Sequence, residues 1–206
     1  MKPDDIEALS FSIIDKEAGP HGFPPAQWHI VRRMIHTSAD FDYLRTVRFH
    51  SRAVAAGIGA IRGGKAVITD TNMAKVGIRD RELKTFGVSV TCLMADPEVA
   101  RIARETGTTR ARAAVDAAVA TMTDGIYVVG NAPTALLRLI ELIGDGSARP
   151  ALVIGLPVGF VNAAESKQAL MELDTPYISN VGRKGGSNLA ASVVNALAIL
   201  ATDTDQ

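Results

Sequence analysis

Apolar residues in the first third of the chain recur every three or four positions, the spacing of one side of a helix. The pattern predicts a first helix that ends at Gly19, a second that starts at Pro25 and a third over residues 51–61. The apolar stripes of the first two are Ile6, Leu9, Ile13 and Ile14, and Trp28, Val31, Met34 and Ile35. Both helices are therefore amphipathic.

Beyond residue 64 the pattern changes to short apolar runs separated by helix-like segments. The runs cover residues 66–69, 88–93, 126–129, 152–154 and 177–179. They are rich in β-branched residues and show no polar alternation, which is typical of parallel strands buried on both faces. The segments between them predict helices over 97–105, 109–122, 133–143, 163–173 and 187–201, while 71–87 is less clearly helical.

This alternation predicts an α/β fold: a three-layer sandwich with a flavodoxin-like parallel sheet of five strands and an N-terminal helical arm. The flavodoxin-like order is the default for five strands, since the pattern itself does not determine which strands are neighbours. We expect a single domain over residues 1–206, with the arm at residues 1–64 and the sheet core at residues 65–202.

The balance of charges narrows the range of partners. The 206 residues include 22 Lys and Arg against 22 Asp and Glu. Such a chain lacks the uniform basic field that non-specific binding to nucleic acid or an anionic membrane needs, so any cationic site must be local. The N-terminus has no basic start and apolar run of a signal peptide, and no stretch of about 18 apolar residues occurs. We therefore expect a soluble, cytoplasmic protein.

The turns that follow the predicted strands are the expected place for a ligand, because open α/β sheets bind ligands beyond the carboxyl ends of their strands. The last turn is the most distinctive, since Arg183 and Lys184 precede two glycines and Ser187 at the start of the final helix. Free N–H groups and the helix dipole favour an anion there. A solvated basic turn with Ser187 as the helix cap is the alternative. Walker A, Rossmann and Gly-x-Ser-x-Gly motifs do not occur.

Among four histidines, His36 is the best candidate for proton transfer. It lies near the end of the second helix, with Arg32 and Arg33 within one turn and Asp40 four residues later. Arginines disfavour the imidazolium and a carboxylate favours it, and such opposed effects suit a proton donor and acceptor near neutral pH. The alternative is a helix-end histidine that is hydrogen-bonded to a carbonyl.

Metal and thiol chemistry have little support in the sequence. No two histidines have the spacing of a helical zinc motif, and the single Cys92 lies in a predicted strand, where packing is its more frequent role. Arginines from several elements instead favour a ligand with several carboxylates, with surface ion pairs as the alternative. They are Arg32, Arg33, Arg45, Arg48 and Arg110.

Seven segments, in order, resemble the precorrin-8X methylmutase family. They are IEALSFSII (6–14), VRRMIHTSAD (31–40), TDTNM (69–73), GNAPTAL (130–136), PVGFV (157–161), AESK (164–167) and GRKGGS (182–187). The resemblance runs from Ile6 to about Leu200. It implies an isomerase of cobalamin biosynthesis that moves a methyl group from C-11 to C-12 of precorrin-8X to give hydrogenobyrinate, or of cobalt-precorrin-8 to give cobyrinate.

The resemblance also implies roles for single residues. His36 would be the proton donor and acceptor, and Ser10 and Arg33 would contact the substrate. The family is usually homodimeric, with the tetrapyrrole near the subunit interface, and its fold is a flavodoxin-like sandwich.

We expect three more substrate-binding residues, Arg110, Asn131 and Lys184. The expected partners are the tetrapyrrole substrate and product, with neither nucleic acid nor membrane, and we expect no cofactor and no protein-bound metal. Two other functions remain open at this point: a non-catalytic corrinoid-binding carrier and a generic nucleotide-binding α/β domain.

Overall fold

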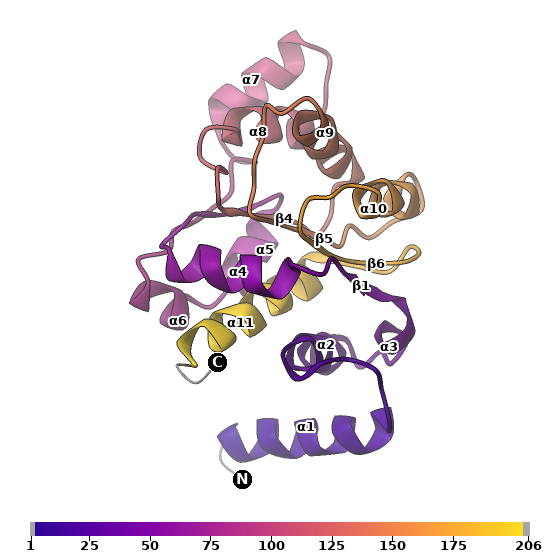
Figure 1. Ribbon diagram of the computed structural model, residues 1–206. Coiled ribbons are helices and arrows are strands. Elements are labelled where there is room, and N and C mark those ends of the chain that lie inside the picture. Colours follow the sequence, from indigo (N-terminus) through magenta and orange to yellow (C-terminus); the bar gives the residue numbers. More distant parts are fainter. Residues whose placement is uncertain (1–2, 204–206) are drawn as a thin grey trace.

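The computed structural model describes residues 3–203, with side chains from Asp5 onward. At its centre is a six-stranded sheet with the order β1-β6-β5-β4-β2-β3 (Figure 1). The strands are β1 (Val47–Phe49), β2 (Val67–Thr69), β3 (Val90–Thr91), β4 (Ile126–Val129), β5 (Leu152–Gly155) and β6 (Tyr177–Asn180). β1 pairs with β6 in the antiparallel direction, and all other neighbours are parallel. Each predicted apolar run overlaps one of the five parallel strands.

Helices cover both faces of the sheet (Figure 1). One face carries α2 (Pro25–Ser38), α4 (Ala53–Arg62) and α11 (Ser187–Thr202), and α5 (Asn72–Gly77) and α6 (Asp80–Thr85) pack on α11. The other face carries α8 (Arg110–Ala118), α9 (Pro133–Gly144) and α10 (Ala163–Met171). α1 (Pro3–Ala18) packs outside α2, and α7 (Pro97–Glu105) packs outside α8; the short α3 (Tyr43–Thr46) follows α2.

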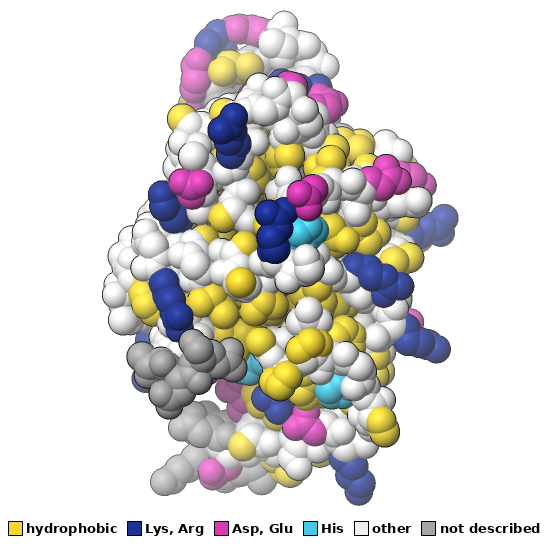
Figure 2. Space-filling model, viewed as in Figure 1, with side chains coloured by type: hydrophobic (Ala, Val, Ile, Leu, Met, Phe, Trp, Pro, Cys, Tyr) yellow, Lys and Arg dark blue, Asp and Glu magenta, His cyan; other side chains and the backbone are white. Residues whose placement is uncertain are grey.

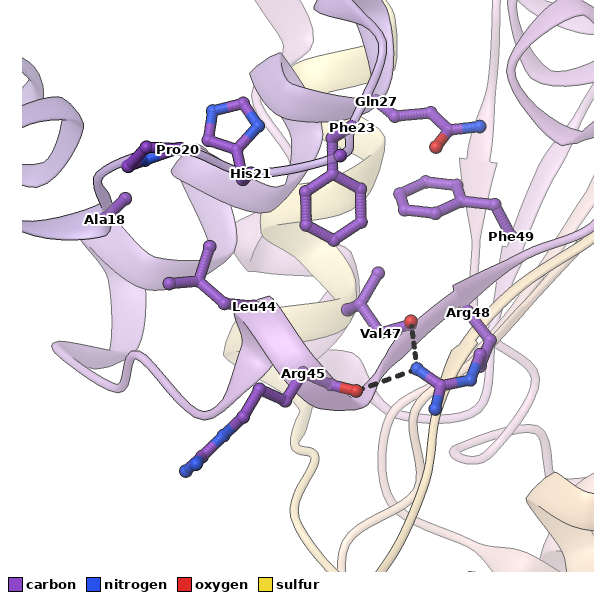
Figure 3. A pocket seen from close by; sticks show the side chains of 11 residues that line it. Ala18, Pro20, His21, Phe23, Gln27, Leu44, Arg45, Val47, Arg48 and Phe49 are labelled. Carbon is purple, nitrogen blue, oxygen red and sulfur yellow. Dashed lines mark hydrogen bonds between the residues drawn. The ribbon is translucent and has the colours of Figure 1, made fainter.

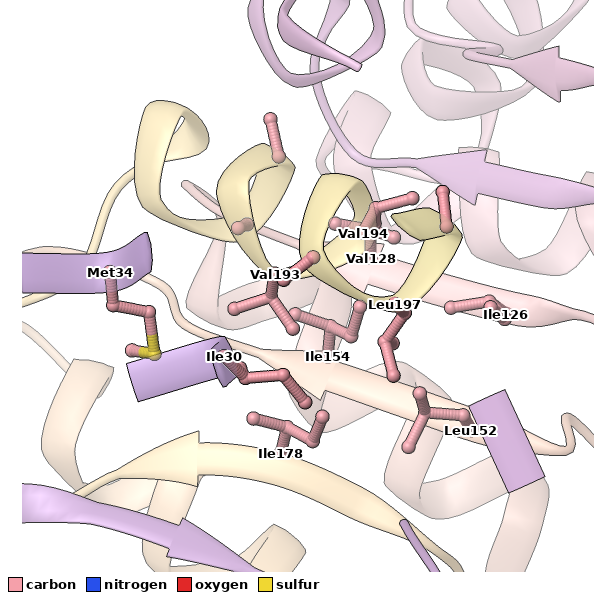
Figure 4. Close-up of a cluster of buried hydrophobic side chains, with 14 of the residues drawn as sticks. Ile30, Met34, Ile126, Val128, Leu152, Ile154, Ile178, Val193, Val194 and Leu197 are labelled. Atoms are coloured by element: carbon pink, nitrogen blue, oxygen red, sulfur yellow. The ribbon is translucent and has the colours of Figure 1, made fainter. Parts of the chain in front are cut away.

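Side chains alternate along each strand between two hydrophobic cores. In β4, Ile126 and Val128 face α2, α4 and α11, while Tyr127 and Val129 face α8, α9 and α10. α11 lies in the middle of the first core, and Leu197 is among the α11 side chains that meet the sheet there (Figure 4). Burial on both faces explains why the parallel strands have no polar alternation.

β1 is the strand that the sequence pattern did not predict, so the sheet has six strands and the predicted number of five is wrong. It is only three residues long, with Arg48 exposed between Val47 and Phe49. The Arg48 guanidinium donates to the carbonyls of Val47 and Arg45, both at 2.8 Å. A charged side chain of this kind protects the free edge of a sheet from pairing with another chain.

The first 64 residues take a larger part in the sandwich than an arm would. β1 joins the sheet, and α2 and α4 cover one of its faces. Only α1 lies outside the layers, and its apolar stripe is largely open to solvent: Ile6, Leu9 and Ile13 are 53%, 49% and 47% exposed. Ile14 is the buried member of the stripe.

Candidate functional site

Asp70 occupies the point where the strand order reverses, between the carboxyl ends of β2 and β4. Its buried carboxylate accepts three backbone N–H bonds, from Gly130 at 2.9 Å, Asn131 at 2.8 Å and Ala132 at 2.7 Å. Burial raises the pKa of Asp70, and the three donors act in the opposite direction. The carboxylate therefore fixes the turn that leads into α9 and holds Asn131 at the edge of the sheet with its side chain exposed.

The same contacts bear on the nucleotide-binding alternative. Nucleotide-binding α/β folds aim backbone N–H groups at a phosphate at this switch point. Here an internal carboxylate already takes the N–H groups of residues 130–132. A phosphate in that position would meet the negative charge of Asp70 instead of free donors, which argues against a nucleotide site at this point of the sheet.

The basic turn after β6 is an ion-paired loop. The Lys184 ammonium contacts Asp40 Oδ2 at 2.5 Å and Asp42 Oδ2 at 2.7 Å, and these hydrogen bonds raise the pKa of Lys184. The alternative interpretation took Ser187 as the cap of this helix, but Gly186 is the cap residue of α11, and Ser187 Oγ lies 2.7 Å from Thr71 Oγ1 instead. The turn thus connects α11, the start of α5 and the segment that follows α2.

Lys167 is a buried cation beneath this turn. Its side chain has no exposed surface, and its ammonium donates to Lys184 O at 2.7 Å and Asn180 Oδ1 at 3.1 Å. Burial lowers the pKa of Lys167 to about 8. Sequence reasoning did not single this residue out, although a signal was present: the buried positions of α10 follow helical spacing and include Lys167 between Ala163 and Leu170.

His36 lies in the last turn of α2 with an exposed side chain. With Ser10 it lines a cavity of about 370 Å³ between α1 and the end of α2. The Phe11 ring meets the imidazole edge-on, with centroids 5.2 Å apart. The His36 imidazole makes no hydrogen bond to another described residue, so the alternative of a carbonyl-bonded helix-end histidine has no support. Asp40 pairs with Lys184 instead. Both ring nitrogens are therefore available to a ligand.

Arg33 does not line that cavity. Its guanidinium contacts Glu7 Oε1 at 2.5 Å and lies 4.9 Å from the centroid of the Phe11 ring. It lines a second, smaller cavity of about 260 Å³ that also involves Arg79 and Asn188. Ser10 and His36 thus line one cavity and Arg33 lines another, although the Phe11 ring contacts both His36 and Arg33.

The remaining arginines do not gather into one site. Arg110 is exposed at the first position of α8, on the opposite face of the sheet from α2 (Figure 1). Arg32 pairs with Asp15 and Arg45 with Asp42. These two match the alternative of surface ion pairs, and cations and anions are interspersed on the face that Figure 2 shows.

Another cavity is lined by Arg45 and Arg48 but by none of Ser10, Arg33, His36, Arg110, Asn131 and Lys184. It measures about 530 Å³ and lies between the α1–α2 connection, α3 and β1. Figure 3 shows Phe23 and Phe49 facing its interior, with Arg45 directed away from the two rings. Arg48 at its rim is bonded to backbone carbonyls. Volume therefore does not identify the functional site here.

Residues 3–203, the part of the chain that the structure describes, contain no group of three or more His, Cys, Asp or Glu side chains arranged to hold a metal ion. No helix within this range has the length and apolar character needed to cross a membrane.

Comparisons with known proteins agree with one another. The family model described as precorrin-8X methylmutase matches residues 5–200. The chain is 47% identical to the cobalt-precorrin-8 methylmutase of Priestia megaterium over 98% of this chain and 89% of that one. It is 38% identical to the precorrin-8X methylmutase of Pseudomonas aeruginosa, over 94% and 93% of the two chains. A crystal structure of the Thermus thermophilus precorrin-8X methylmutase superposes with a TM-score of 0.90 at 50% identity, covering 98% of this chain and all of that one.

Proposed function

Because the chain belongs to the precorrin-8X methylmutase family, isomerases that carry out the methyl shift of cobalamin biosynthesis, we propose that His36 is the proton donor and acceptor of that shift. The observation that carries the proposal is the position of His36. Its ring is exposed at the end of α2, faces a cavity shared with Ser10, and makes no hydrogen bond to another described residue.

In the proposed reaction His36 donates one proton to the substrate and later accepts it back. The protonated imidazole gives its proton to an atom of the conjugated ring, which makes the framework electron-poor. The methyl group then leaves C-11 with its bonding electrons and forms a bond to C-12, and the neutral imidazole takes the proton back. Substrate and product are isomers, so no atoms or electrons are gained or lost. Positioned proton transfer of this kind contributes about 10²–10⁴-fold in rate.

We assign substrate contacts to Ser10, Arg33, Arg110, Asn131 and Lys184. Ser10 is supported by the cavity that it shares with His36, and Asn131 by its exposed side chain at the carboxyl edge. Lys184 uses two of its three ammonium hydrogens on Asp40 and Asp42, which leaves the third for a substrate carboxylate. Arg33 is supported by its charge and by its place one helical turn from His36, where both side chains contact Phe11. Arg110 is supported by charge alone, since it lies on the opposite face of the sheet.

We further propose a flavodoxin-like arrangement, a homodimer and a cytoplasmic location. The order β3-β2-β4-β5-β6 of the parallel strands supports the first, with β1 added at the edge. The stripe of α1 is half-exposed although the helix packs on α2, which supports a second copy as its cover. The cytoplasmic location stays a prediction of the sequence.

The test is turnover by the purified protein with precorrin-8X and, separately, with cobalt-precorrin-8, followed by the appearance of the corrin absorbance. We expect His36→Ala to lower kcat by about 100-fold or more. The control is His21→Ala, because His21 stacks on Trp28 away from the site. Turnover of His36→Ala within about threefold of the wild type would show that another group transfers the proton. Product binding without repeated turnover by the wild type would favour a corrinoid carrier.

A further inference from the structure

The side chains of Phe160 and Val161 are exposed to solvent at the carboxyl edge of the sheet. They lie in the loop of residues 157–162 between β5 and α10 and are 84% and 77% exposed. The chain has six phenylalanines, all within the described residues, and Phe160 alone is exposed. Isolated exposed apolar residues are common, but two neighbouring large ones at a ligand-binding edge mark a contact surface.

The backbone of this loop is tightly fixed, so the exposure of Phe160 is built into the fold. Gly186 N–H donates to Leu156 O at 2.9 Å, and Gly159 N–H donates to Arg183 O at 3.2 Å. A side chain at Gly185 would lie only 2.2 Å from Leu156 O, so the two loops pack backbone against backbone.

The residues on either side of the Phe160–Val161 pair have backbone angles that L side chains rarely adopt. Gly159 has φ +153° and Asn162 has φ +59°. Conformations of this kind are kept where the surrounding structure enforces them, often at binding sites. Gly159 and Asn162 lie on either side of Phe160 and Val161, whose side chains are exposed.

Arg183 and Lys184 connect this loop in space to the segment that follows His36. The Arg183 guanidinium carbon lies 5.6 Å from the centroid of the Phe160 ring. The next residue, Lys184, pairs with Asp40 and Asp42. An apolar surface, a cation and the end of α2 thus line one stretch of the carboxyl edge.

We propose, on the basis of the function proposed above, that Phe160, Val161 and Arg183 form the platform on which the macrocycle docks. Phe160 and Val161 contact the flat face of the conjugated ring, and Arg183 binds one of its carboxylates. A large planar ligand with an acidic periphery fits this pair of surfaces, because an aromatic ring stacks on it and a guanidinium pairs with its rim.

The experiment measures the binding of hydrogenobyrinic acid, by its absorbance, to the wild type, Phe160→Ser and Phe160→Leu. We expect Phe160→Ser to raise Kd by about 10- to 100-fold, the effect of exposing an apolar side chain of this size, and Phe160→Leu to raise it less. Arg183→Met should weaken binding of the free acid more than binding of its methyl esters. The control is Val76→Ser, because Val76 on α5 is 83% exposed, and its Kd should match the wild type.

Sedimentation velocity on the same samples separates the platform from a contact between copies of the chain. We expect Phe160→Ser to keep the mass of the wild type. An unchanged Kd in Phe160→Ser, or a changed mass, would overturn the inference while the proposed function stands. A wild type that neither binds nor converts a corrinoid would instead overturn the proposed function, and the platform with it.

Discussion

Replacing Lys167 by methionine should change how stability depends on pH. Lys167 is fully buried, and its hydrogen-bond acceptors are the neutral oxygens of Lys184 and Asn180. Its charge therefore lacks a bonded carboxylate to offset the loss of hydration, and burial lowers its pKa from 10.5 to about 8. Methionine has a similar length and no charge, so the substitution removes this titration.

The size of the effect follows from the shift in pKa. Between about pH 8 and pH 10.5 the unfolded chain holds the Lys167 proton and the folded chain has lost it. Since the unfolded state then binds more protons, the free energy of unfolding rises with pH across this window. Lowering the pKa of Lys167 from 10.5 to about 8 corresponds to about 3 kcal/mol, and below about pH 8 the folded protein bears the full cost of the buried charge.

Urea unfolding followed by circular dichroism, at several values between about pH 7 and pH 11, measures this difference. We expect the wild type to gain about 3 kcal/mol relative to Lys167→Met across the range. Lys75→Met, a change at an exposed lysine of α5, should run parallel to the wild type. A difference that stays constant within about 1 kcal/mol would mean that Lys167 titrates normally, and the reasoning from its burial would be refuted.

Two further predictions concern the edge of the sheet and α1. Asp70→Asn keeps one acceptor oxygen for three backbone donors and removes the charge. Thermal unfolding should therefore show a free energy of unfolding lower by about 2 kcal/mol or more. A change near zero would contradict the role of Asp70 in holding the turn. Ile13→Glu places a charge in the half-exposed stripe of α1 and should convert a dimer to monomers in sedimentation velocity, whereas Ser12→Glu on the same helix should not. If the wild type and both variants have the same mass, either the dimer contact lies elsewhere or the chain forms no dimer.

Strands that are buried on both faces appear in the sequence as continuous apolar runs. Helices that are buried along one stripe show apolar residues every three or four positions. The sequence pattern therefore predicted the parallel strands and the long helices. It missed β1, where only Val47 of three residues is buried, which is too short a signal for a strand. It gave no warning that most of the α1 stripe is exposed, because amphipathic spacing does not say what covers a helix. The sequence pattern also could not predict the ion-pair partners of Lys184, since Asp40 lies 144 residues away along the chain.

The charges buried beneath the carboxyl edge explain what kind of ligand this edge can hold. Asp70 takes the backbone donors at the start of α9, and Lys167 donates to the backbone of the turn after β6. A site of this kind cannot bind a phosphate through free backbone amides at the switch point, as many α/β folds do. We therefore expect recognition to come from side chains at the rim, where the proposed contacts His36, Asn131 and Phe160 are exposed. Side chains spread along an edge suit a wide ring with acidic groups on its periphery, which is why an overall neutral chain can serve a polycarboxylate substrate.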